Sequence, residues 1–192
     1  MKNGKEAGIG NITVEMLKTD IDTTADVLQD LLSLIWEEER ITEDWCKGLI
    51  VKLPKKRDST NCGSWRGITL MPTAAEVMGK VIVKRISRGV DKRLRKEQAG
   101  LRSGRSTIGQ IFVLRNIIGQ SVKWNASLYI CFIDHEKAFD SVHRETLWRI
   151  MSSYGIPPKL VRMVQAVYKG SKCAVIDGGG KTDWLDIKSG VR

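Results

Sequence analysis

The chain has 192 residues and a formal net charge of +10 at pH 7, enough length for one domain or two small subdomains. Neither a signal peptide nor an apolar run long enough to span a membrane is visible, so we expect an intracellular protein without a membrane partner. The four cysteines form no Cys-x-x-Cys pair. This excludes a recognisable zinc-ligand pattern and favours free thiols in a reducing compartment.

The positive charge is concentrated in one segment, residues 46–105. That segment holds 16 Lys and Arg against 4 Asp and Glu, a net of +12, whereas the remaining residues hold 16 basic and 18 acidic residues, a net of −2. A charge gathered in this way favours a polyanionic partner such as nucleic acid. The alternative is a basic surface that only interacts with water.

The residue pattern of the first part of the chain predicts a glycine-containing loop, followed by helices and a hairpin. Residues 12–17 begin a short helix, and Asp22 and Thr23 are cap candidates for a helix to about Arg40 with an apolar core stripe. Residues 48–53 and 65–70 read as two short strands around a polar, basic turn. We therefore predict a hairpin with a basic tip.

A long helix follows the hairpin. Thr73 and Glu76 have capping-box spacing, and the helix is predicted to run to about Leu94 with one apolar face. The opposite face is basic: Lys80, Lys84, Arg85, Arg88, Lys92 and Arg93. This face could follow a nucleic-acid backbone, or it could be a solvated helix face, and the sequence leaves both readings open.

The second half of the chain centres on the run Leu128–Ile133. Before it, Ser106 or Thr107 is predicted to cap a helix whose apolar stripe is core. The run itself is unalternating and apolar, which favours a strand buried on both faces of a sheet. After it we expect Asp140 to cap a helix, a further helix with proline in its first turn at residues 157–158, and a hairpin around the glycines at 178–180.

Asp134 stands directly after the predicted buried strand. A carboxylate at such a place is costly unless it is paired, hydrogen-bonded or bound to a cation, and Phe139 follows five residues later. The pattern is compatible with a metal and nucleotide site. A lone aspartate after a strand is also a common turn former.

Four stretches together resemble one family. Residues 54–70 (PKKRDSTNCGSWRGITL), residues 97–107 (EQAGLRSGRST), residues 132–142 (FIDHEKAFDSV) and residues 189–192 (SGVR) occur in this order. They resemble the reverse transcriptases of non-LTR, LINE-type retrotransposons. The sequence departs from the family pattern in two places. Leu101 replaces a usual Phe, and Gly8-Ile9-Gly10-Asn11 replaces a Gly-Pro-Asp-Gly turn.

The resemblance implies a fold and its division. It implies an α/β (α+β) chain, helix-rich with a small sheet, consisting of right-hand polymerase fingers at residues 1–124 and the start of a palm at residues 125–192. The Tyr-x-Asp-Asp hairpin, which carries the family's other catalytic aspartates, has no match in this sequence. The resemblance therefore implies the N-terminal part of an RNA-directed DNA polymerase domain, which is inactive by itself.

The resemblance also implies site residues. Asp134 corresponds to a catalytic metal-binding aspartate, and the backbone carbonyl of His135 adds a ligand. Phe139 corresponds to the steric gate that selects deoxynucleotides. Residues implied to contact the triphosphate are Lys55, Lys56 and Arg66. Residues implied to contact nucleic acid are Gln98, Gly100, Arg102 and Arg105.

The implied cofactor is Mg²⁺, two ions in the complete polymerase, with Mn²⁺ as a substitute; carboxylate and phosphate oxygens suit such ions. The implied partners are an RNA template, a DNA primer and deoxynucleoside triphosphates. The implied location is the nucleus or cytoplasm, in a ribonucleoprotein of the element. Oligomeric state is not implied.

Two other functions remain as alternatives. One is a non-catalytic nucleic-acid-binding remnant that uses the basic segment. The other is an unrelated magnesium-dependent phosphoryl-transfer enzyme, which would need further carboxylates near Asp134.

Overall fold

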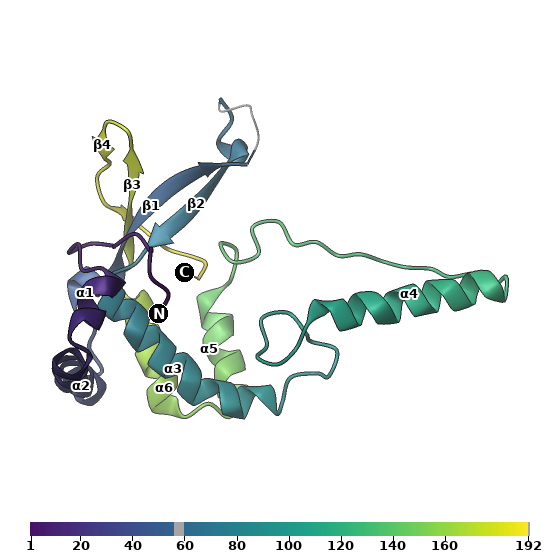
Figure 1. Ribbon diagram of the computed structural model, residues 1–192, viewed down its shortest axis with the longest axis horizontal. Helices are drawn as coiled ribbons and strands as arrows, with labels where there is room; N and C mark the ends of the chain where they lie inside the picture. The colour runs from purple at the N-terminus through teal and green to yellow at the C-terminus, as the bar shows by residue number, and fades with distance from the viewer. Residues whose placement is uncertain (56–59, 192) are drawn as a thin grey trace.

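The computed structural model describes residues 1–55 and 60–191, and the fold is a mixture of helices and one small sheet (Figure 1). The helices are α1 (Val14–Thr19), α2 (Ile21–Glu38), α3 (Thr73–Asp91), α4 (Thr107–Lys123), α5 (Arg144–Ser153) and α6 (Pro158–Tyr168), with short 3-10 turns at Glu43–Cys46 and Cys62–Ser64. The strands are β1 (Lys47–Pro54), β2 (Trp65–Leu70), β3 (Lys172–Asp177), β4 (Gly180–Lys181) and β5 (Leu185–Asp186). The predicted α/β class is confirmed.

The sheet joins the early and late parts of the chain. Its strand order is β2-β1-β3-β4, with β5 also paired to β3. β1 and β2 are antiparallel with Leu53 opposite Arg66, whereas β1 and β3 are parallel with Leu49 opposite Ala174. Both predicted hairpins are confirmed. The parallel pairing of β1 with β3 was not predicted.

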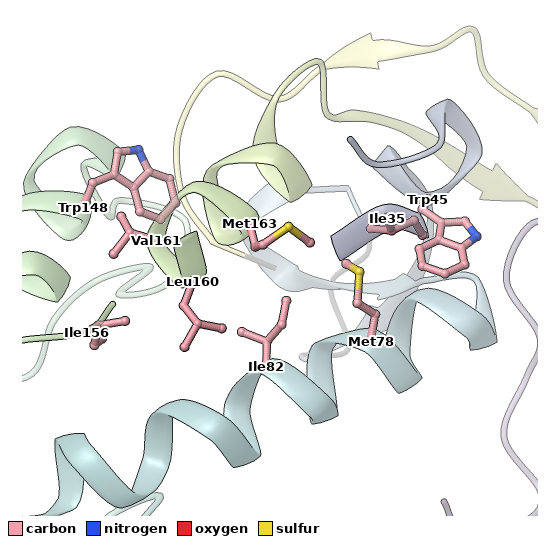
Figure 2. Packing of buried hydrophobic residues seen from close by; sticks show 9 residues of the cluster. All are labelled: Ile35, Trp45, Met78, Ile82, Trp148, Ile156, Leu160, Val161 and Met163. Carbon is pink, nitrogen blue, oxygen red and sulfur yellow. The ribbon is translucent and has the colours of Figure 1, made fainter. Parts of the chain in front are cut away.

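The core lies between α3 and α6 and draws on both halves of the chain (Figure 2). Apolar side chains spaced three or four residues apart on each helix face one another, which is the pattern that buries one stripe of an amphipathic helix. The buried cluster consists of Ile35, Trp45, Met78, Ile82, Trp148, Ile156, Leu160, Val161 and Met163. Sheet and core thus both cross the predicted boundary near residue 124, and the division into fingers and palm stays a prediction.

The N-terminal segment packs across the junction between β2 and α3. Gly8 is buried, and a Cβ atom there would collide with the carbonyl of Met71. The Gly8 carbonyl accepts a hydrogen bond from the Asn11 amide at 3.2 Å, so a turn occupies residues 8–11 although the sequence there departs from the family's turn. The Thr73 hydroxyl donates to the Ile12 carbonyl.

The predicted caps of α2 and α3 need correction. Asp20, not Asp22 or Thr23, caps α2 by accepting from the Thr23 amide. Pro72 occupies the N-cap position of α3 without a side-chain hydrogen bond, because the Thr73 hydroxyl is used by the N-terminal segment. By contrast, Ser106 caps α4 and Pro158 lies in the first turn of α6, as predicted.

The predicted buried strand at Leu128–Ile133 is wrong. The segment is extended but is not a strand, and Tyr129, Phe132 and Ile133 are 94%, 79% and 78% exposed. The apolar stripe of α4 is also not core, since no residue of that helix is buried. Figure 1 shows α4 and the following segment standing apart from the rest of the molecule. Within the described residues, no sheet edge or apolar surface covers them.

In the described part of the chain, no helix has the length and apolarity needed to span a membrane.

The exposure of this segment can be tested through its thiol. Cys131 is exposed, whereas Cys46 and Cys173 are buried, and burial protects a thiol until the structure opens. In a Cys62→Ser background, we expect a thiol reagent to label Cys131 first. Cys46 and Cys173 should react at a rate on the order of 100-fold lower, or lower still. Mass spectrometry of timed samples measures this, and a protected Cys131 would restore the buried-strand interpretation.

Candidate functional site

A cavity lies between the β1–β2 hairpin and the turn that precedes α5. Its volume is about 850 Å³, within the range of pockets that hold small ligands. The hairpin contributes Lys55, Gly63, Trp65, Arg66, Gly67 and Thr69. The opposite wall consists of residues 136–140 and Val191.

Strand pairing and the side chain of Lys52 position the hairpin wall of the cavity. Lys55 donates its amide to the Ser64 carbonyl at 2.7 Å, which closes the hairpin next to Trp65 and Arg66. The Lys52 ammonium lies 5.3 Å from the centre of the Trp65 ring and forms a 2.7 Å ion pair with Asp177 of β3. The hydrogen bond from Lys52 lowers the pKa of Asp177. These contacts tie the hairpin to β3.

The opposite wall is a turn in which Ser141 donates its amide to the Lys137 carbonyl at 3.0 Å. Phe139 lines the cavity from this turn and is 63% exposed. The Val191 amide donates to the Phe139 carbonyl at 2.9 Å. Arg66, Lys55 and Phe139, all implied to contact a nucleotide, therefore line one cavity. Lys56 lies outside the described residues.

Asp134 and His135 do not line this cavity, as far as the described residues define it. Both are exposed in the extended segment before the turn. The described residues contain no group of three His, Cys, Asp or Glu side chains that could hold a metal ion. The carboxylate of Asp134 is a suitable oxygen ligand, but by itself it does not fit a complete magnesium site.

Asp140 does not cap α5, contrary to expectation. His143 is the cap: its Nδ1 accepts from the Thr146 amide at 3.3 Å. Asp140 instead forms part of the cavity wall, and its carbonyl accepts from the Ser189 hydroxyl at 3.5 Å. Ser189, which contacts Asp140, and Val191, which contacts Phe139, both belong to the SGVR stretch that the sequence analysis singled out.

The loop after α3 contains the residues implied to contact nucleic acid. Arg102 is only 6% exposed and pairs with Asp91 at 2.7 Å, which lowers the pKa of that carboxyl through the hydrogen bond. Its remaining donors bind the carbonyls of Asp91, Arg95 and Gln98. Arg102 thus holds the loop together, and its guanidinium faces protein groups rather than solvent.

Gln98, Leu101 and Arg105 of this loop are exposed. The Gln98 side chain donates to the Gly100 carbonyl at 3.3 Å. Arg105 is exposed, and Leu101, at the position where the family usually has Phe, is 97% exposed with a φ of 58°. A bulky apolar side chain that projects in this way is unusual. The roles of Gln98, Gly100, Arg102 and Arg105 toward nucleic acid stay predictions.

Comparison with known proteins gives one family match and several relatives. A family model described as reverse transcriptase (RNA-dependent DNA polymerase) matches residues 53–192. The chain is 24% identical over 192 residues to the "Transposon TX1 uncharacterized 149 kDa protein" of Xenopus laevis, covering 100% of this chain and 15% of that protein. It is 25% identical over 146 residues to "RNA-directed DNA polymerase from mobile element jockey" of Drosophila funebris, covering 74% and 16%.

A third relative is the "Retrovirus-related Pol polyprotein from type-1 retrotransposable element R2" of Popillia japonica, 23% identical over 149 residues, with 77% of this chain and 21% of that protein covered. The chain thus spans 15% to 21% of the length of these relatives. The resemblance to LINE-type reverse transcriptases that the motifs carried is confirmed. Since the family model covers most of the chain, including both walls of the cavity, this protein belongs to the reverse transcriptase family.

Proposed function

We propose that the chain supplies the nucleotide-binding part of an RNA-directed DNA polymerase of a LINE-type mobile element. The observation that carries the proposal is the cavity that unites Lys55 and Arg66 with Phe139. Guanidinium and ammonium groups suit the oxygens of a triphosphate. An aromatic ring on the facing wall suits a sugar or base.

In this proposal the two walls have separate tasks. Arg66 and Lys55 bind the triphosphate from the hairpin, and a hairpin can move with its ligand more easily than a buried strand. Phe139 limits the space beside the sugar and so disfavours a 2′-hydroxyl. The 63% exposure of Phe139 leaves its ring available for such a contact.

Reverse transcriptases as a family use divalent metal ions. We propose Mg²⁺ as the ion, with Asp134 and the carbonyl of His135 as ligands from this chain. Because the described residues form no complete site, further ligands from the whole protein are part of the proposal.

The proposed nucleic-acid partners, an RNA template and a DNA primer, are supported by a basic stripe on α3. Lys80, Lys84, Arg88 and Lys92 are exposed and four residues apart, and the described carboxylates form no ion pair with them. Like charges at this spacing destabilise a helix, a cost that a phosphate backbone would remove. Arg85 and Arg93 of the same predicted face instead contact Trp36 and the Ser153 carbonyl.

A nucleic-acid-binding protein without catalysis is the second candidate, and the same stripe favours it. In the first candidate the cavity binds a nucleotide and Asp134 binds a metal ion, whereas the second candidate requires neither. Nucleotide binding separates them, and the two further experiments test the nucleic-acid partner and polymerisation by this chain.

Nucleotide binding is tested by titrating the purified chain with magnesium and a deoxynucleoside triphosphate in a calorimeter. We expect Arg66→Ala to weaken binding about 10- to 100-fold, because a hydrogen bond to a charged group contributes about 1.5–3 kcal/mol. Arg149→Ala is the matched control, since Arg149 is exposed on α5 and does not line the cavity. Equal affinity of the Arg66→Ala variant and the unaltered chain would refute the assigned role.

Nucleic-acid binding is tested with a fluorescent single-stranded RNA over a range of salt concentrations. The double variant Lys84→Ala/Arg88→Ala should bind more weakly, and its salt slope should fall by about 1.4, since each phosphate contact to a single strand contributes about 0.7. Arg149→Ala/Lys169→Ala removes the same charge from other elements. Asp134→Ala should leave binding unchanged, and a salt slope that the stripe variant does not alter would contradict the role of α3.

Polymerisation by this chain is tested by primer extension with magnesium and labelled deoxynucleotides. We expect no extension, because the reaction needs metal ions held by several carboxylates and the described residues bring no such set together. A full-length retroviral reverse transcriptase serves as the positive control. Extension that depends on Asp134 would show that the chain is a polymerase by itself.

A further inference from the structure

Arg144, the first residue of α5, has no role in the site described so far, yet its side chain binds four backbone carbonyls. Nε donates to Gly190 at 2.9 Å, and Nη1 donates to Ile187 at 3.0 Å and to Tyr168 at 3.5 Å. Nη2 donates to Ser189 at 3.3 Å. Every nitrogen of the guanidinium therefore has a partner in the end of α6 or in the segment 187–190.

The guanidinium also lies against an aromatic ring. Its Cζ atom is 4.9 Å from the centre of the Tyr168 ring, and that ring packs against Trp148 of the core at 5.8 Å. Within the described residues no carboxylate forms an ion pair with Arg144. A planar group that stacks and donates in several directions is a property of Arg that Lys does not share.

The segment that Arg144 holds is joined directly to the wall of the cavity. The Gly190 amide donates to the Val142 carbonyl at 3.0 Å, and the Val191 amide donates to the Phe139 carbonyl at 2.9 Å. Gly190 has a φ of 78°, and a Cβ atom there would lie 2.6 Å from the Asp140 carbonyl oxygen. The two backbones therefore approach closely only because residue 190 is glycine.

Phe139 has few other constraints. The segment before its turn, residues 128–135, is extended and exposed without strand partners in the described chain. The turn itself contains Lys137 at a φ of 47°, and the Phe139 ring is 63% exposed. The backbone hydrogen bonds from Gly190 and Val191 therefore contribute to the position of the ring, beside the bond from Ser141 to Lys137 within the turn.

We propose that Arg144 is a positioning residue for sugar selection: it fixes the segment 187–190 and, through Val191, sets the place of Phe139 in the cavity. The inference rests on the proposed nucleotide-binding function. Loss of the guanidinium should release Phe139 and reduce the preference for 2′-deoxynucleotides over ribonucleotides, while Lys55 and Arg66 still bind the triphosphate.

The experiment compares Arg144→Lys with Arg149→Lys, which makes the same change on the same helix. Amide hydrogen exchange by NMR reports the anchor without any nucleotide. We expect the Gly190 and Val191 amides of the Arg144→Lys chain to exchange about tenfold faster, corresponding to one hydrogen bond of a charged group. Amides of the β1–β2 hairpin should not change.

The second readout is the ratio of affinities for a deoxynucleoside and a ribonucleoside triphosphate with magnesium. We expect Arg144→Lys to lower this ratio several-fold and to change total triphosphate affinity less. Gly190→Ala keeps Arg144 but separates the same backbones, so it should lower the ratio as well. A merely structural role would lower the melting temperature of both variants and leave the ratio unchanged.

The outcomes separate the two proposals. If the unaltered chain binds nucleotide but exchange and the ratio in Arg144→Lys equal those of Arg149→Lys, the positioning role is overturned alone. If the unaltered chain binds no nucleotide, the proposed function is overturned and sugar selection with it. Faster exchange at Gly190 and Val191 together with a lower ratio supports the positioning role.

Discussion

The structure depends on the parallel pairing of β1 with β3. These strands are far apart in the sequence, and their register places Leu49 opposite Ala174, which is fully buried. Because β1 also pairs with β2, the β1–β2 hairpin is carried to the C-terminal part of the chain. The C-terminal segment in turn binds the turn that contains Phe139, and Arg66 and Phe139 line the same cavity.

The cavity combines two kinds of support. Its hairpin wall is held by side chains, notably Lys52 between Trp65 and Asp177. Its opposite wall is held by backbone hydrogen bonds and the close approach at Gly190. A side-chain-supported hairpin suits a part that adapts to a triphosphate, whereas a backbone-supported turn suits a part that fixes one aromatic ring. The Arg144 side chain supports the segment next to this second wall, since its guanidinium donates to the carbonyls of Ile187, Ser189 and Gly190.

The apolar surface of α4 and the segment 128–133 contrasts with this organised part. Burial of apolar side chains stabilises a fold only where another apolar surface is available, and the described residues offer none to Phe112, Phe132 or Ile133. Asp134 lies at the end of the same uncovered segment and is therefore exposed as well. Asp134 lies outside the cavity that Arg66 lines and follows directly on the exposed apolar run.

The sequence by itself determined the family, the two hairpins and the amphipathic faces of α3 and α6, because motif order, turn glycines and helical spacing are local properties. It also singled out Arg66 and Phe139, which the structure places in the lining of one cavity. It did not determine which apolar runs are buried: Leu128–Ile133 has the composition of a core strand, but a strand needs hydrogen-bonding neighbours that no local pattern specifies. Only the tertiary structure decided that Arg102 faces Asp91, that His143 rather than Asp140 caps α5, and that Arg144 reaches the carbonyls of residues 187–190. Each of these depends on backbone groups that are distant in sequence or compete for one role, and their arrangement is set by packing.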